Sequence, residues 1–82
     1  MKISIKQLSL SFGVTWALFV VSIGWTAGLI GWGNQLVIVM SSLYRGFDAT
    51  FIGGLIGGVW GLTDGLIFGA LVAYFYNLSK KL

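Results

Sequence analysis

Two long apolar segments constrain the fold of this chain more than any other feature. The first covers roughly residues 8–30 without a charged residue, and the second covers roughly residues 51–78 with Asp64 as its one charged residue. A helix needs about 20 apolar residues to cross the roughly 30 Å hydrocarbon core of a bilayer. The sequence therefore predicts an all-α membrane protein in which two transmembrane helices form a hairpin.

The composition agrees with a membrane protein and lacks the residues that several kinds of functional site need. Charged residues make up 9% of the 82-residue chain, whereas ordinary soluble domains carry about a quarter. The chain is too short for a second domain, so residues 1–82 are taken as a single unit. It contains no cysteine and no histidine, so thiol chemistry and the commonest ligands of zinc and haem iron are missing. We therefore expect no metal ion and no cofactor.

The basic residues predict the orientation of the hairpin. Lys2 and Lys6 precede the first segment, Lys80 and Lys81 follow the second, and the connection between them holds only Arg45. By the positive-inside rule both termini are expected in the cytoplasm, in the cytoplasmic (inner) membrane of a prokaryote. The alternative is a cleaved signal peptide, but the first apolar run is too long and no A-x-A-like site follows it. The expected partner is the lipid bilayer, with no nucleic acid.

The apolar part of the connection between the two segments is too short to cross a bilayer. On a helix over residues 34–45, polar side chains share one arc: Gln35, Ser42 and Arg45. Apolar side chains share the other: Leu36, Met40, Leu43 and Tyr44. This pattern predicts a short helix lying in the membrane interface, begun by Asn34 and ended by Gly46. An extended loop is the alternative.

Small residues recur at every fourth position of the second segment: Gly53, Gly57, Gly61, Gly65, Gly69 and Ala73. In water each glycine would cost such a helix about 1 kcal/mol relative to alanine. In lipid the helix must satisfy its own backbone hydrogen bonds and persists, while small residues let a second backbone approach closely. We call these six residues the glycine row and predict that it packs against another helix.

The neighbour of the glycine row is less narrowly predicted. Positions four residues apart advance about 40° around a helix at each step, so the row winds roughly halfway round. One helix can follow it by crossing in the right-handed sense. Otherwise the row serves two neighbours, the first segment through Gly24 and Gly28 and then a different molecule. A stripe of hydroxyl residues opposite these glycines favours self-association or docking on a larger complex: Ser11, Thr15, Ser22 and Thr26.

Asp64 requires an explanation because an aspartate at mid-membrane costs about 2.5–3.5 kcal/mol on insertion scales. In one hypothesis the neutral carboxyl group donates a hydrogen bond across the helix contact. Thr15, Ser22 and the indole of Trp16 lie at a similar depth, with Trp60 one turn away on the same helix. In the second hypothesis Asp64 lines a water-filled pore between several hairpins. In the third it carries protons.

A set of residues in the C-terminal half, together with "SLYRGF" before it, forms a recognisable pattern: Gly57, Trp60, Gly61, Asp64, Gly65, Gly69, Ala73, Tyr76 and Asn77. It resembles small two-span prokaryotic membrane proteins labelled bacteriophage holin or holin-like. The first segment is similar only in general character, including "GVTWAL". Because holins are defined by making holes, the resemblance implies a homo-oligomer, or a pore, in the membrane. A non-catalytic accessory subunit of a larger membrane complex is the alternative.

The outline of the chain is also similar to the proton-carrying c subunit of rotary ATP synthases, a hairpin with a carboxylate midway along its second helix. That family has its glycine row in the first helix and its polar turn in the cytoplasm, whereas here the row lies in the second segment. Neither resemblance implies an enzyme. The sequence shows no nucleophile–base pair, metal cluster or phosphate-binding loop, so we expect no catalytic activity.

Overall fold

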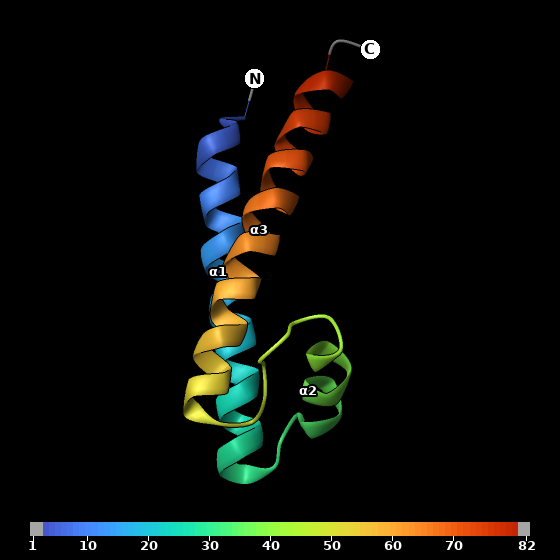
Figure 1. The fold of residues 1–82 in the computed structure, drawn as a ribbon. Helices are drawn as coiled ribbons and strands as arrows, with labels where there is room; N and C mark the ends of the chain where they lie inside the picture. Colours follow the sequence, from blue (N-terminus) through green and yellow to red (C-terminus); the bar gives the residue numbers. More distant parts are fainter. Residues whose placement is uncertain (1–2, 81–82) are drawn as a thin grey trace.

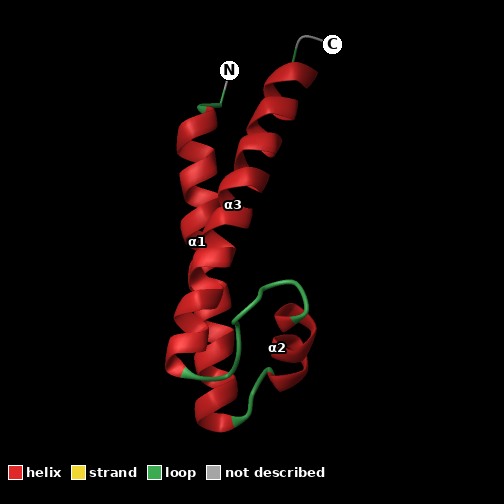
Figure 2. Ribbon diagram, viewed as in Figure 1, coloured by secondary structure: helices red, strands yellow, loops and turns green. Residues whose placement is uncertain are grey.

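The computed structural model describes residues 3–80, so Lys2 and Lys81 of the orientation argument lie outside the described residues. Within this range it contains three helices and no strand: α1 (Ile5–Ile30), α2 (Asn34–Ser41) and α3 (Phe51–Ser79) (Figure 2). The helices α1 and α3 pack side by side, and the first turn of α1 and the last turn of α3 lie at the same end (Figure 1). Both are long and apolar enough to cross a membrane. The all-helical prediction is confirmed.

The helix ends are set by local hydrogen bonds. The Ser4 hydroxyl accepts from the Gln7 amide at the start of α1, and Gly31 ends the helix in the left-handed conformation at φ 75°. At the start of α3 the Thr50 hydroxyl accepts from the Gly53 amide. Asp48 in turn accepts from the backbone amide and hydroxyl of Thr50. The connecting segment therefore fixes the point at which α3 begins.

The connecting segment (residues 31–50) does not extend away from the long helices but folds back beside them (Figure 1). Val37, Met40 and Tyr44 form its buried side. Of the four residues of the predicted apolar face, Met40 and Tyr44 are buried, whereas Leu36 and Leu43 are exposed. The helix also ends at Ser41, so Tyr44 lies in the irregular chain that follows.

Phe47 is the centre of the small apolar core. Its side chain is 2% exposed and packs with buried residues of α1 and the connecting segment: Val20, Ile23, Ala27, Val37, Met40 and Tyr44. A Cβ atom added at Gly24 or Gly57 would meet the Phe47 ring. The ring therefore occupies space that the missing side chains of two glycines leave open, one on α1 and one on α3.

Candidate functional site

The glycine row is buried along its whole length. A Cβ atom added at Gly61 would lie 3.2 Å from an α1 backbone atom, and one added at Gly65 or Gly69 would lie 2.6 Å from another. The facing positions on α1 are also small and also four residues apart: Ala17, Gly13 and Ser9. Each step of four residues along α3 is thus matched by four residues back along α1, so the two backbones are in contact.

The N-terminal end of the row has a different neighbour. A Cβ atom at Gly53 would meet the carboxylate of Asp48, and one at Gly57 would meet the ring of Phe47. The row therefore has two neighbours, α1 and the connecting segment, both in the same chain, whereas the two-neighbour alternative assigned the second place to a different molecule. The surface that was expected to receive a second molecule is occupied by the connecting segment.

The two α1 glycines of the predicted packing face also meet the connecting segment. Gly24 is buried, and an added Cβ atom would lie 3.2 Å from the Cα atom of Gly54 on α3 and 2.9 Å from the Phe47 ring. Gly28 is exposed on one side, while its other side faces the carbonyl group of Ala49. Both positions require a small residue, chiefly because a larger side chain would collide with the connecting segment.

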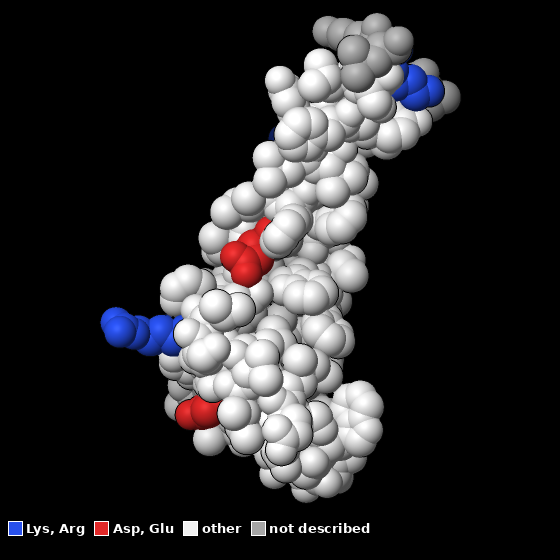
Figure 3. All heavy atoms as spheres, turned by 90° about the vertical axis from the view of Figure 1, so that its right-hand side faces the viewer, with Lys and Arg blue, Asp and Glu red and all other residues white. Residues whose placement is uncertain are grey.

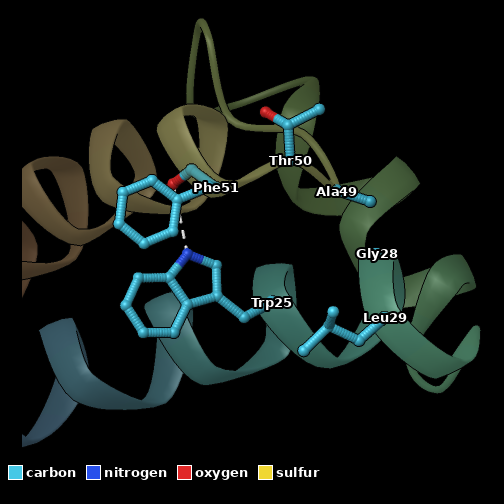
Figure 4. Close-up of a pocket in the computed structure, with 6 residues that line it drawn as sticks. All are labelled: Trp25, Gly28, Leu29, Ala49, Thr50 and Phe51. Carbon is cyan, nitrogen blue, oxygen red and sulfur yellow. Dashed lines mark hydrogen bonds between the residues drawn. The ribbon is translucent and has the colours of Figure 1, made fainter.

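A pocket of about 270 Å³ opens beside Gly28 at this end of the molecule (Figure 4). The indole of Trp25 stacks on the Phe51 ring, with centroids 5.0 Å apart, and its Nε1 donates to the Phe51 carbonyl oxygen at 3.1 Å. Leu29, Ala49 and Thr50 complete the lining. The stacked rings and this hydrogen bond connect the start of α3 to the last turns of α1.

Asp64 is the last acceptor of a hydrogen-bonded chain that joins α1, the connecting segment and α3, with Tyr44 as its middle member. The Tyr44 hydroxyl donates to Asp64 Oδ2 at 2.6 Å, and it accepts from Trp16 Nε1 at 3.0 Å. The Tyr44 ring also stacks on Trp60, with centroids 6.0 Å apart and an interplanar angle of 5°. Within the described residues, the donor to the carboxylate is therefore Tyr44.

The predicted partners of Asp64 need correction. Thr15 and Ser22 are exposed on the side of α1 opposite to Gly13 and do not contact the carboxylate. Trp16 reaches it only through Tyr44. Trp60 is 39% exposed, and its indole N–H donates to the backbone carbonyl of Arg45 rather than to a side chain. The hydroxyl stripe lies opposite Gly24 and Gly28, as its helical spacing predicts, and on that side of α1 its hydroxyl groups cannot reach Asp64.

Tyr44 was missed because it was assigned only to an apolar face. A signal was present, since a buried tyrosine almost always finds a partner for its hydroxyl group. Asp64 was the one charged residue of either predicted span. A tyrosine on the short connection, near two helices that enclose a single carboxyl group, was therefore the natural candidate for its donor.

The carboxylate opens onto a groove of about 340 Å³ whose lining residues come from all three parts of the fold: Phe12, Trp16, Tyr44, Asp64, Gly65, Phe68 and Val72. Figure 3 shows carboxyl groups at two places on this side of the molecule, the upper one surrounded by uncharged atoms. Asp64 is half-buried. The site thus presents one acidic group on an apolar and aromatic surface.

At the opposite end, Asn77 of α3 holds the start of the chain. The Ile3 amide donates to Asn77 Oδ1, and Asn77 Nδ2 donates to the Ile3 carbonyl oxygen, each at 2.9 Å. The Ser9 hydroxyl adds a bond of 2.6 Å to the carbonyl oxygen of Leu66. The bonds of Asn77 hold the residue before α1, and the bond of Ser9 joins α1 to α3 beside Gly69.

Tyr44 makes the stability of the connecting segment depend on pH. Burial raises the pKa of its hydroxyl above the ordinary value of 10.0, and the hydrogen bond to Asp64 raises it further. The neutral hydroxyl therefore contributes stability that is fully present below pH 10.0 and is lost as the pH rises through the higher pKa of the folded protein. We expect the thermal unfolding temperature in detergent micelles to fall over this alkaline range.

Tyr44→Phe is expected to lower the free energy of unfolding at neutral pH by about 1 kcal/mol, because it removes the donor to Asp64. It should also remove most of the alkaline decrease. Tyr74→Phe is the control, since Tyr74 is 53% exposed near the end of α3. An alkaline decrease that is the same in Tyr44→Phe as in the parent would contradict this role of the hydroxyl group.

No three acidic, histidine or cysteine side chains gather within residues 3–80. The distinctive chemistry of the arrangement is a single carboxylate held by a buried tyrosine at the middle of a glycine-packed helix pair. Comparison of the chain with protein-family models, with curated proteins and with solved structures finds no match.

Proposed function

We propose that this protein is a non-enzymatic integral membrane protein, a helical hairpin in the cytoplasmic membrane of a prokaryote, that acts as a holin-like homo-oligomer. The length and apolar character of α1 and α3 support insertion. The contact between them also supports it, because close approach of backbones at small residues is typical of helices that pack in lipid.

The observation that carries the proposal is the exposed hydroxyl stripe of α1. Ser11, Thr15 and Ser22 lie on the side of the helix that faces away from α3, and all three are exposed. Lipid offers these groups no hydrogen-bond partner, whereas a second copy or a water-filled lumen does. We infer that copies associate through this stripe rather than through the glycine row, which is already filled within the chain.

A non-conducting accessory subunit is the second candidate. The observation in its favour is that two hydroxyl groups of α1 already have partners in their own helix. Ser11 donates to the Gln7 carbonyl oxygen at 2.9 Å, and Thr26 donates to that of Ser22 at 2.8 Å. Helices with such internal bonds pack against a partner without needing to enclose water.

The test combines native mass spectrometry with dye release from liposomes. The variant Ser11→Ala/Thr15→Val/Ser22→Ala removes three exposed hydroxyl groups with little change in shape. Interhelical hydrogen bonds in lipid contribute about 0.6 kcal/mol each, so association is expected to weaken by about twentyfold. Dye release should fall with it, while helical content stays unchanged.

Thr63→Val is the matched control, because Thr63 is exposed on α3 and donates to its own helix at the Val59 carbonyl oxygen. It should assemble and release dye like the parent. An oligomer that releases no dye would favour the accessory subunit. A parent protein that stays monomeric would overturn the homo-oligomer, and a triple variant that assembles as tightly as the parent would overturn association through the hydroxyl stripe.

A further inference from the structure

The groove beside Asp64 combines aromatic faces with a negative charge. Phe12, Trp16 and Phe68 are 41%, 40% and 61% exposed at its sides, and buried Tyr44 contributes to its lining. The face of an aromatic ring carries negative electrostatic potential and attracts cations. Several rings around one concavity form the type of surface that recognises organic ammonium groups.

Asp64 is the only charged side chain among the residues that line this groove. Tyr44 donates one hydrogen bond to its Oδ2 atom, whereas two carboxylate oxygens together accept about four. The carboxylate therefore has capacity for a further partner. Since an unpaired charge is costly in an apolar environment, a ligand of opposite charge is the partner that this site favours.

The size of the groove limits the kind of ligand. Its volume of about 340 Å³ lies at the lower end of the range of about 300–1,000 Å³ that is usual for small-molecule sites. The lining is otherwise apolar, so a strongly hydrated metal ion or an inorganic cation would find few oxygen ligands there. A single cation with apolar substituents matches both the volume and the lining.

We propose that the groove lined by Phe12, Trp16, Tyr44, Asp64 and Phe68 binds a lipophilic organic cation, with the charge against Asp64 and the apolar groups against the rings. This site lies within one chain and is independent of the assembly proposed above. It assigns a role to the carboxylate that packing alone does not explain, because Asp64 is only half-buried and opens to the surface.

Tetraphenylphosphonium is a suitable probe, and tetraphenylborate is a control of nearly the same shape and opposite charge. Binding of each to the purified full-length protein in nanodiscs is measured by equilibrium dialysis, with quenching of tryptophan fluorescence as the second readout because Trp16 lines the groove. We expect saturable binding of the cation and only non-saturable partition of the anion. Saturable binding of both ions with equal affinity would overturn the proposal.

Asp64→Asn keeps the shape of the side chain and removes its charge, and it should weaken cation binding about tenfold or more, as expected for a charged contact. Trp16→Leu should weaken it less and remove the fluorescence response. Asp48→Asn is the matched control, because Asp48 is the other acidic residue and does not line the groove. Unchanged binding by Asp64→Asn with native helical content would overturn the proposal.

The natural ligand is one of two kinds of cation: a free molecule, or the choline group of a lipid. Nanodiscs of phosphatidylglycerol and of phosphatidylcholine distinguish them. Tetraphenylphosphonium affinity that falls in phosphatidylcholine, in the parent but not in Asp64→Asn, identifies a choline headgroup as a competitor for the carboxylate. Equal affinity in both lipids identifies a free cation as the ligand.

Discussion

Gly65→Leu is expected to separate α1 from α3 and to produce the largest loss of stability of any single change in the glycine row. The neighbours of Gly65 are the Phe12 carbonyl oxygen and the Gly13 backbone, with Gly13 N 2.8 Å from the position of an added Cβ atom. Unlike a side chain, the backbone cannot avoid the clash by changing its rotamer. Overpacking of this kind costs about 1–3 kcal/mol or more, and a leucine adds three further carbon atoms beyond the Cβ.

Reversible unfolding in mixed micelles, followed by circular dichroism and tryptophan fluorescence, measures this loss. Thr63→Leu is the control, because Thr63 lies only two residues away and is exposed. A surface change of that kind is expected to alter the free energy of unfolding by about 0.5 kcal/mol or less. If Gly65→Leu unfolds at the same point as Thr63→Leu, the close contact of the two backbones is absent from the folded protein.

Phe47→Ala is expected to release the connecting segment from the long helices. The ring is 2% exposed and fills the space over Gly24 and Gly57. Its removal leaves a cavity, and the two glycines have no side chains that could fill it. Replacing a buried phenylalanine by alanine costs about 3–5 kcal/mol. Because Tyr44 is close in sequence and its ring packs against Phe47, the contact with Asp64 should weaken as well.

Cleavage by trypsin after Arg45 reports this release directly. The Arg45 carbonyl oxygen, which belongs to the peptide bond that trypsin cleaves, accepts from Trp60 Nε1 at 2.8 Å and is held in place by it. The rate of cleavage should rise in Phe47→Ala and stay near that of the parent in Leu43→Ala, whose side chain is 74% exposed in the same segment. Equal rates in both variants would contradict the anchoring role of Phe47.

The long helices could be predicted because the signals that define them are local. Hydropathy alone placed the two segments, and the observed bounds of α1 and α3 differ from the predicted ones by three residues or fewer. The glycine row was readable for a similar reason, since a repeat of four residues stays on one winding stripe of a helix. Which molecule fills that stripe is not a local property, and the connecting segment was not considered as a neighbour.

The surroundings of Asp64 depended on contacts between residues far apart in sequence. Tyr44 and Asp64 are 20 residues apart, and Trp16 is 28 residues from Tyr44. Periodicity placed Asp64 toward the side on which α3 packs, but it could not indicate that the chain between the helices folds back along them. The buried position of Phe47, which holds that chain in place, likewise has no periodic signal because Phe47 lies outside every helix.

Small residues recur with the same four-residue spacing on α1 and α3, and this affects how the register of the two helices is determined. A slide of one helix past the other by four residues, about 6 Å, would bring small residues opposite small residues again. Backbone packing by itself therefore distinguishes poorly between neighbouring registers. The correct register is selected by groups that occur only once, namely the bond from Tyr44 to Asp64 and the paired bonds between Asn77 and Ile3.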